Sequence, residues 1–412
     1  MKILVLAGGI PQIELIKQLR SRFAGCEIIL ADYSEHPAAE NYVDKFYRES
    51  TLDIPAIEKI ATEEKVDFLI TVCTDQALNT VAEVSEKLGL PCYIDAKTGK
   101  NVTNKRYMKK VFEEYGIPSA KSMILNTVPE SLPENFGYPL VVKPVDCNSS
   151  KGVIKVADFE EFKTAVKNAL EYSRTKQAII EEFIEGKELS VDLYVHEGEP
   201  EVLCVSESQK IRQDDKFVIY RAIYPSGVPE NTLKEIKVIA KQIVNAFKLK
   251  SCPMLIQMLY CDSKLYVVEF SARTGGALKY QLIRQASGAD IISATIDATL
   301  GESRPIQKGK SYKYITNEFF YCHYGVFDRV EGFEELEKEG IITNYFVFKN
   351  KGTLMDKISN SGDRVASITI ATDSYKDLVE RHQKAIKRVK AIDINGQDIL
   401  NHGITYELPE RN

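Results

Sequence analysis

Short apolar runs alternate with amphipathic segments along roughly the first 90 residues of the chain. This pattern predicts strands over 2–7, 27–32, 67–72 and 90–95, and helices after Gly9, over 53–64 and over 76–88. Strands joined through helices form a parallel sheet, because each connection must return to the edge where the previous strand began. Ligands of such sheets bind at the carboxyl ends of the strands, here near Gly8, Asp32 and Thr74.

Charge and composition exclude several classes of protein. The 412 residues include 54 Lys and Arg against 59 Asp and Glu, so the net charge of −5 provides no basic field for nucleic acid or anionic lipid. The apolar runs fall short of the roughly 20 residues that span a bilayer. The eight cysteines are scattered without a CxxC pair, and the five histidines have no nearby partner, which argues against zinc and disulfide sites. We expect a soluble, cytoplasmic protein that acts on small molecules.

Beyond residue 104 the strands follow one another more closely, as is typical of antiparallel sheets. Further helices are expected over 105–115, 158–172, 230–248 and 374–390. A tight turn over 261–263 joins two strands. We therefore predict an α/β domain over 1–104, a second domain over 105–304 with a lid at about 118–184, and a mixed α+β region over 305–412. The basic stretch of the last helix lacks interleaved aromatic residues and is expected to be a solvated face.

Two lysine-bearing motifs and a small polar loop indicate a phosphate site. Lys105 opens a helix in the motif KRYMK, and Lys143 ends a strand in the motif VVKP. The loop that follows contains Ser149, Ser150 and Gly152. Consecutive backbone N–H groups of such a loop can bind phosphate oxygens while a lysine supplies the compensating charge. The loop alone is equally compatible with an ordinary hairpin turn.

The motif EEFIEGKE over 181–188 contains acidic residues on both sides of a Glu-Gly bend. Backbone groups at Glu182 and Ile184 can hold a purine, and the Glu188 carboxylate can hold a ribose. An exposed hairpin with charged edges is the alternative interpretation.

A fourth motif indicates a metal site. If three residues form the turn at 261–263, Gln257 and Glu269 lie opposite each other on one face, because side chains alternate along strands. Neighbouring oxygen ligands suit a Mg²⁺ ion that also binds nucleotide phosphates. Arg273 could hold a developing acyl phosphate, or it could simply pair with the glutamate.

In this order the motifs resemble those of the ATP-grasp carboxylate–amine ligases, over about residues 1–300. This family includes L-amino-acid ligases, purine-pathway ribonucleotide ligases and the halves of carbamoyl-phosphate synthetase. The resemblance implies an ATP-grasp fold and gives each motif a role. By that resemblance, Lys105 and Lys143 bind phosphate, Ser149, Ser150 and Gly152 form the phosphate loop, Glu181, Glu182, Phe183 and Ile184 form the adenine hinge, Glu188 binds ribose, and Glu269 is the main Mg²⁺ ligand.

The sequence departs from the family pattern at three places. The loop has less glycine than usual, Gln257 stands where many members have a metal-binding acid, and Ser271 stands where many have asparagine. An amide oxygen can ligate Mg²⁺, but the lost negative charge predicts weaker metal binding.

Two other functions compete with the ligase interpretation. A dehydrogenase is suggested by the glycines at 8–9 followed by Asp32, but the GxGxxG fingerprint is incomplete and Pro11 stands near the start of the helix. A sensor or scaffold that binds ATP without turnover is suggested by Gln257.

We predict an ADP-forming ligase that uses ATP and Mg²⁺ to activate a carboxylate as an acyl phosphate, which an amine then attacks. Its catalytic residues would be Lys143, Glu269 and Arg273, and its metal ligands Glu269, Gln257 and Ser271. Substrate contacts are expected from Arg273, Gly275, Gly276, Lys210 and Arg221. The basic residues over 207–226 suit an anionic substrate, with an ordinary charged surface strand as the alternative. The C-terminal third would close over the site or form the face of a homodimer.

Overall fold

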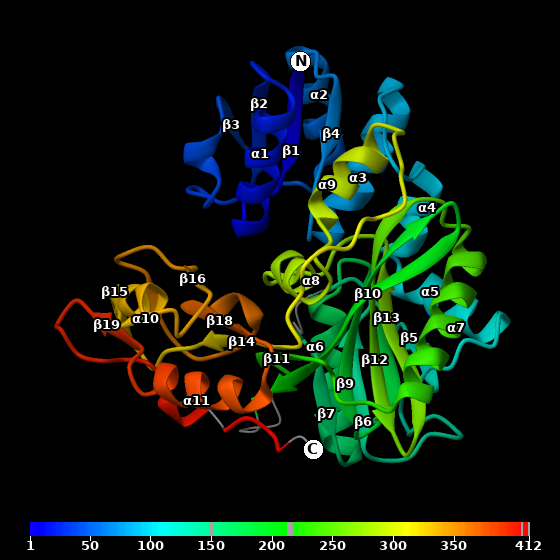
Figure 1. Cartoon of the computed structure of the whole chain (residues 1–412). Helices are drawn as coiled ribbons and strands as arrows, with labels where there is room; N and C mark the ends of the chain where they lie inside the picture. The colour runs from blue at the N-terminus through cyan, green and yellow to red at the C-terminus, as the bar shows by residue number, and fades with distance from the viewer. Residues whose placement is uncertain (148–151, 212–216, 405–406, 411–412) are drawn as a thin grey trace.

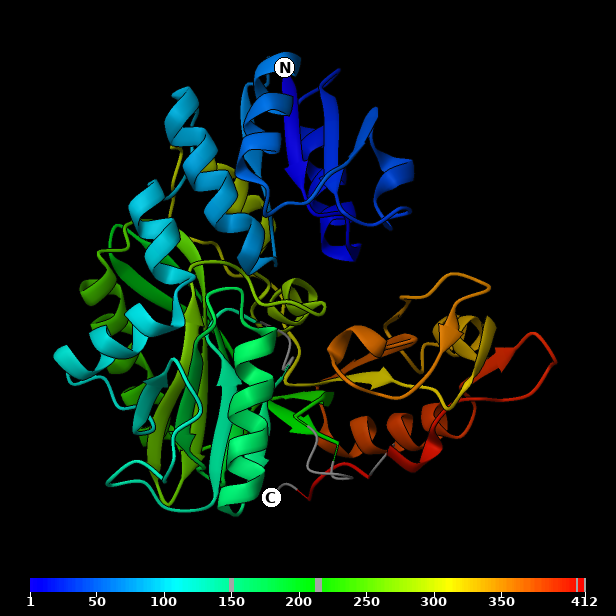
Figure 2. The same cartoon turned by 180° about the vertical axis from the view of Figure 1, so that it is seen from behind.

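The computed structural model describes residues 1–147, 152–211, 217–404 and 407–410. The N-terminal domain lies at the top of Figure 1, above a large twisted sheet, and the C-terminal region extends from one side of that sheet. Figure 2 shows the same arrangement from behind. No helix in the described ranges combines the length and the apolar character needed to cross a membrane.

The N-terminal domain contains the predicted parallel sheet. Its strands run in the order β3-β2-β1-β4, and every pairing is parallel. The strands are β1 (Lys2–Leu6), β2 (Glu27–Asp32), β3 (Lys45–Arg48) and β4 (Phe68–Ile70), and the helices are α1 (Ile10–Arg22), α2 (Ile54–Glu64), α3 (Asp75–Leu88) and α4 (Ala96–Val102). Both faces of the sheet are buried, as expected for parallel strands between helices.

The strand predicted over 90–95 is wrong, because this segment has no strand pairing. Pro91 has no backbone N–H to donate to a sheet ladder. Asp95 instead begins α4, and its carboxylate accepts a hydrogen bond from the Thr98 backbone N–H at 2.6 Å. The segment thus links α3 to α4 as an irregular chain, and α5 (Lys105–Glu114) follows α4.

An antiparallel sheet forms the centre of the molecule, and its described strands run in the order β13-β12-β9-β10-β11-β14-β18-β16. These strands are β9 (Lys187–His196), β10 (Glu199–Lys210), β11 (Ile219–Tyr224), β12 (Cys252–Cys261), β13 (Lys264–Ser271), β14 (Tyr314–Phe320), β16 (Asn344–Val347) and β18 (Ala366–Thr372). All of the neighbouring pairs are antiparallel. The strands of the C-terminal region therefore continue the sheet of the central domain without a break.

Helices cover the two faces of this sheet. Helix α7 (Glu230–Phe247) buries Ile236, Ile243 and Phe247 against one face, together with Phe270 of β13. On the other face, α8 (Lys279–Ser287) and α9 (Ile291–Thr299) pack between the sheet and the N-terminal domain. Because side chains alternate along strands, the second face receives the polar residues of β12 and β13.

A smaller antiparallel sheet lies at the edge of the central domain. Its order is β5-β8-β6-β7, with strands β5 (Ser122–Leu125), β6 (Leu140–Pro144), β7 (Ile154–Val156) and β8 (Ala178–Glu182), and α6 (Phe159–Tyr172) covers it. Phe162, Val166 and Ala169 of α6 are buried against the strands. This unit lies within the predicted lid, over 118–184.

The C-terminal region adds a third antiparallel sheet, of order β17-β15-β19, to the central one. Its elements are β15 (Gly325–Glu331), α10 (Phe333–Lys338), β17 (Leu354–Met355), α11 (Tyr375–Ile386) and β19 (Lys390–Asp393). The helix predicted over 374–390 ends earlier, at Ile386, and Lys390 begins β19. Arg381 and Arg388, two of the basic residues of this stretch, form surface ion pairs with Asp377 and Glu339.

Candidate functional site

The hairpin of β12 and β13 places Gln257 directly opposite Glu269. The turn itself has two residues, Asp262 and Ser263, both with positive φ (47° and 60°), rather than the three predicted. An irregularity next to Gln257 shifts the register by one residue and restores the pairing. The predicted pair is therefore present, but a bulge and not the turn length produces it.

Lys105 lies beside this pair. Its Nζ is 3.3 Å from Glu269 Oε2 and donates to the Cys147 carbonyl oxygen at 2.6 Å. Asn104 caps α5 by accepting a hydrogen bond from the Tyr107 backbone N–H at 3.0 Å, which fixes the first turn that carries Lys105. The helix thus holds an ammonium group where two strands end, next to the predicted phosphate loop.

Glu181 is buried between two lysines. Lys143 Nζ donates to Glu181 Oε2 at 2.6 Å, and Lys109 Nζ lies 2.7 Å from Glu181 Oε1. Burial would raise the pKa of Glu181, but the two ammonium groups outweigh it and lower that pKa to about 2. Burial lowers the pKa of Lys143, and Lys109 and Lys105 act in the same direction against Glu181. Lys109 is the last residue of the motif KRYMK, and the sequence analysis assigned it no role. Lys109 follows Lys105 by four residues, so the two side chains lie on one helix face, and this spacing could have indicated a shared site.

The predicted adenine hinge leaves β8 at its end. The backbone N–H groups of Glu182 and Phe183 donate to the carbonyl oxygens of Lys121 and Pro139. Lys155 Nζ lies 4.3 Å from the centre of the Phe183 ring. The Glu182 side chain is exposed, and Ile184 follows within the same bend. The side chain of Glu181 points to the lysines instead, so any adenine contact from Glu181 would involve its backbone.

The predicted phosphate loop is described only at its end. Ser149 and Ser150 lie outside the described residues. Gly152 has φ +70°, a backbone conformation that favours glycine. A β-carbon at this position would also lie 2.9 Å from Pro144, so both the backbone conformation and the available space favour glycine. Gly152 therefore packs closely against the strand that carries Lys143.

Arg273 is held by a residue that sequence reasoning missed. Its Nε donates to Asp75 Oδ1 at 2.7 Å, its Nη2 pairs with Asp75 Oδ2, and its Nη1 donates to the Thr274 carbonyl oxygen at 2.7 Å. Ser271 also donates its hydroxyl to Asp75. Ser271 is 5% exposed and its hydroxyl binds this carboxylate, so its role as a metal ligand stays a prediction.

Gly275 and Gly276 lie in the loop between β13 and α8. A β-carbon at Gly275 would lie 2.8 Å from Lys279 Cγ and 3.1 Å from Asp192 Oδ1, so this loop packs tightly onto β9. Lys279 Nζ lies 3.6 Å from Asp192 Oδ2 and donates to Ser206 Oγ at 2.6 Å. The glycines thus lie directly after β13, beside the buried pair of Lys279 and Asp192.

The two basic residues predicted to bind substrate lie elsewhere. Lys210 Nζ is 2.5 Å from Glu188 Oε2, so the structure joins this lysine to the predicted ribose ligand. Arg221 has no exposed surface, and it donates to Glu318, Gln209 and the Glu407 carbonyl oxygen. The prediction that Arg221 contacts substrate is wrong for this conformation, because strand alternation turns it into the core with α11.

The donor set fits a Mg²⁺ ion held jointly with nucleotide phosphates. Glu269 supplies one carboxylate, with a side chain 32% exposed, and Gln257 supplies an amide oxygen beside it. Within the described ranges no group of three or more His, Cys, Asp or Glu side chains could hold a metal alone. Mg²⁺ commonly takes one or two protein ligands and completes its shell with phosphates and water.

Comparison with known proteins shows which family combines these features. The family model described as ATP-grasp domain matches residues 136–280, and the model described as L-amino acid ligase C-terminal domain 2 matches residues 318–392. A D-alanine–D-alanine ligase from Acetivibrio thermocellus is 30% identical over 276 residues, which cover 58% of this chain and 70% of the relative. The chain belongs to the ATP-grasp ligases.

Other relatives of this ATP-grasp ligase agree with the assignment. A D-alanine–D-alanine ligase from Christiangramia forsetii is 29% identical over 216 residues, and the match spans 48% of this chain and 64% of that relative's length. The solved structure of an L-amino acid ligase from Bacillus licheniformis has 19% identity and a TM-score of 0.80, and covers 95% of this chain and 98% of its own. The last comparison shows a shared fold.

In this ATP-grasp ligase Asp32 has a structural task. Its Oδ2 accepts a hydrogen bond from the Gly8 backbone N–H at 2.8 Å, and its Oδ1 accepts one from the Ser34 N–H at 2.7 Å. The carboxylate that a dehydrogenase would use for a ribose therefore shapes the glycine loop. Gln12 likewise donates its amide to the Val72 carbonyl oxygen at 2.7 Å.

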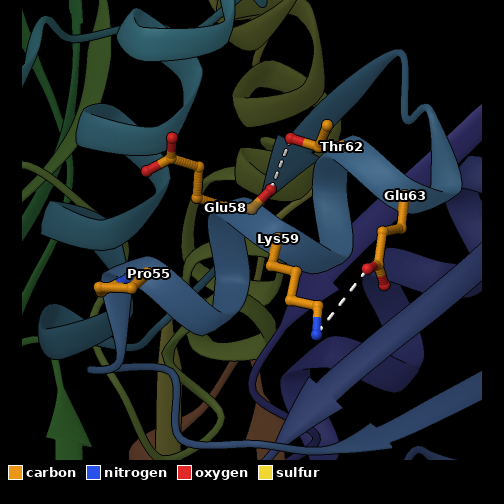
Figure 3. A pocket seen from close by; sticks show the side chains of 5 residues that line it. All are labelled: Pro55, Glu58, Lys59, Thr62 and Glu63. Atoms are coloured by element: carbon orange, nitrogen blue, oxygen red, sulfur yellow. Dashed lines mark hydrogen bonds and ion pairs between the residues drawn. The ribbon is translucent and has the colours of Figure 1, made fainter.

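A shallow depression on the outer side of α2 lies away from these residues (Figure 3). Lys59 and Glu63 form an exposed ion pair at 3.8 Å across one helical turn, and Thr62 donates to the Glu58 carbonyl oxygen. These are ordinary contacts of a solvated helix, and we assign no ligand to them.

Proposed function

We propose that this ATP-grasp ligase joins a carboxylate to an amine with conversion of ATP to ADP and phosphate. A carboxylate oxygen would take the γ-phosphoryl group from ATP, which releases ADP and forms an acyl phosphate. The amine nitrogen would then bond to the carbonyl carbon, lose a proton, and displace phosphate. The observation that supports this proposal is that Lys105 lies 3.3 Å from Glu269, and that Lys105 and Lys143, and likewise Glu269 and Arg273, are close enough for their charges to interact.

The side chains at the site divide this chemistry between them. Lys105 and Lys143 would hold phosphate oxygens, and their charge offsets the charge that develops on the transferred group. Backbone groups at Glu182 and Ile184 would hold the adenine, and Glu188 the ribose. Glu269 and Gln257 would hold Mg²⁺, which when bound supplies further neutralisation of phosphate charge. Arg273 would bind the acyl phosphate.

We propose an amino acid as the source of the carboxylate. The match of residues 318–392 to the L-amino acid ligase C-terminal domain supports this choice over a ribonucleotide substrate. Because the Arg221 side chain is buried, it is not available to bind an anionic group of a substrate, which removes one reason to expect a strongly anionic substrate. The domain boundaries 1–104, 105–304 and 305–412, a cytoplasmic location and a homodimer remain predictions.

The test is mass spectrometry of the purified protein after incubation with Mg²⁺, ATP and the twenty L-amino acids. We expect ADP, and a product whose mass equals two substrates minus one water. Formation of AMP, or no amino-acid-dependent nucleotide turnover by protein that binds ATP, would contradict the proposal.

The second candidate function, an ATP-binding sensor, is favoured by one observation. Gln257 provides no charge where it faces Glu269, so the metal site has one carboxylate. A sensor would bind ATP and change its thermal stability without releasing ADP in the presence of any amino acid in the mixture.

A further inference from the structure

Asp75 reaches from the N-terminal domain into the central domain. It is the first residue of α3, directly after Thr74, and Cys73 before it has a positive φ of 59°. This unusual backbone conformation turns the chain sharply at the end of the parallel sheet. The Asp75 side chain is 22% exposed and meets the end of β13.

The contacts of Asp75 account for one edge of the Arg273 guanidinium group. Asp75 accepts hydrogen bonds from Nε, at 2.7 Å, and from Nη2, and the Thr274 carbonyl oxygen accepts one from Nη1 at 2.7 Å. A guanidinium group has five N–H donors in a fixed plane. Within the described residues these contacts use three of the five donors and leave one N–H on each terminal nitrogen of Arg273. Two such groups suit two oxygens of one phosphate.

The same part of the N-terminal domain fixes the residues around Arg273. Asp75 also accepts the Ser271 hydroxyl, two residues earlier on the same face of β13. Tyr93 donates its hydroxyl to the Ala272 carbonyl oxygen at 3.1 Å. The N-terminal domain therefore holds the end of β13 and the two residues that follow it, through both side chains and backbone.

We propose that Asp75 is the positioning residue for Arg273, and that it orients the guanidinium group toward the phosphate of the acyl intermediate. The inference rests on the proposed function, because it assigns the purpose of one residue of that site. Through this contact the N-terminal domain contributes to chemistry that takes place on the central sheet.

Charge supports this role. Burial would raise the pKa of Asp75, but Arg273 outweighs burial and holds the pKa below its ordinary value. Asp75 therefore stays ionised across the neutral range. An asparagine would keep the shape but lose the charge, and its amide group would meet the Arg273 Nη2 donor with a second donor.

The first experiment compares Asp75→Asn with the unaltered protein. We expect kcat for ADP release with Mg²⁺, ATP and the twenty L-amino acids to fall about 100-fold, since a small misplacement of an anchoring group costs about that much. The Kd of MgADP should change less than threefold, whereas the Kd of inorganic phosphate, measured with MgADP present, should rise at least tenfold. The control is Arg22→Ala, which removes the ion pairs of α1 with Asp297 and Glu302 between the same domains and should leave all three values unchanged.

The second experiment combines Asp75→Asn with Arg273→Ala. If Asp75 acts through Arg273, the asparagine variant costs nothing further in the alanine background. Asp75→Glu keeps the charge and should recover part of the phosphate affinity. Equal losses from Asp75→Asn in both backgrounds, or an unchanged phosphate affinity, would overturn the inference. Full activity of Arg273→Ala would instead overturn the proposed role of Arg273. The experiment therefore distinguishes failure of the inference about Asp75 from failure of the proposed function.

Discussion

The cluster around Glu181 and the cluster around Glu318 each bury one carboxylate among basic groups. Glu181 lies 2.6 Å from Lys143 Nζ and 2.7 Å from Lys109 Nζ. Glu318 lies 2.6 Å from Arg221 Nε and 3.3 Å from His382 Nε2. In each case burial would raise the pKa of the glutamate, but the basic neighbours lower it to about 2.

The two clusters differ in how completely their charges and donors are used. Arg221 is surrounded by acceptors that include Gln209 and the Glu407 carbonyl oxygen, and it has no exposed surface. In the Glu181 cluster, among the described residues, the three lysines at 105, 109 and 143 form ion pairs with two carboxylates, Glu181 and Glu269. An excess positive charge attracts an anion, so we propose that the Glu181 cluster binds phosphate, whereas the Glu318 cluster joins elements of the fold.

The largest effect is expected from Lys143→Ala. The loss of this ammonium group should lower ADP release about a thousandfold, because it removes charge from the phosphate site. A coupled assay for ADP with circular dichroism as a fold check measures this. The matched control is Lys110→Ala in α5, where the side chain is 70% exposed and pairs with Glu114 at 3.5 Å. If Lys143→Ala releases ADP at a rate within tenfold of the unaltered protein, the Glu181 cluster would not differ from the Glu318 cluster in its contribution to phosphate binding.

Arg221→Leu should act on stability instead. Removal of one partner from a buried ion pair leaves an uncompensated charge, which costs about 3–5 kcal/mol. Urea unfolding measures this loss, and Arg329→Ala, at a half-exposed pair with Glu331, should cost less than about 1 kcal/mol. The Kd of MgADP should stay the same for both variants at temperatures where they remain folded. A weaker Kd with unchanged stability would assign the Glu318 cluster to the binding site.

Sequence patterns predicted the parts of the site that depend on local order. The strand ends that carry Lys143 and Glu269, and the helix start that carries Lys105, follow from apolar periodicity and capping. The pairing of Gln257 with Glu269 was also predicted, although a bulge rather than the turn length produces it.

Contacts between distant segments could not be read from the sequence. Asp75 and Arg273 are in contact although 198 positions separate them in the sequence, and no local sequence pattern predicts such a contact. Arg221 looked like a substrate ligand because charge alone does not show which face of a strand is buried. The strand predicted over 90–95 failed because neighbouring strands, and not the segment itself, decide whether a ladder forms.

A third effect concerns acid stability. The pKa values of Glu181 and Glu318 are about 2 in the folded protein against an ordinary value of 4.5. Their stabilising contribution is present above about pH 4.5 and is lost as the pH falls toward 2, on the order of 3 kcal/mol for each. Urea unfolding between pH 6 and pH 3 should show this slope, and Glu181→Gln and Glu318→Gln should each reduce it. The exposed Glu114→Gln is the control, and an unchanged slope in both buried variants would refute the explanation.

The smallest effect is expected from Gln257→Glu, which tests the excess charge itself. A second carboxylate beside Glu269 should lower the Mg²⁺ concentration for half-maximal ADP release about tenfold, because oxygen ligands with negative charge bind Mg²⁺ more strongly. The same change balances the charge of the three lysines, so ADP without metal should bind more weakly. Gln397→Glu adds the same charge at an exposed turn and should alter neither value. Tighter binding of metal-free ADP by Gln257→Glu would show that excess positive charge is not what attracts the nucleotide. The difference between the Glu181 and Glu318 clusters could then not be explained by their net charge.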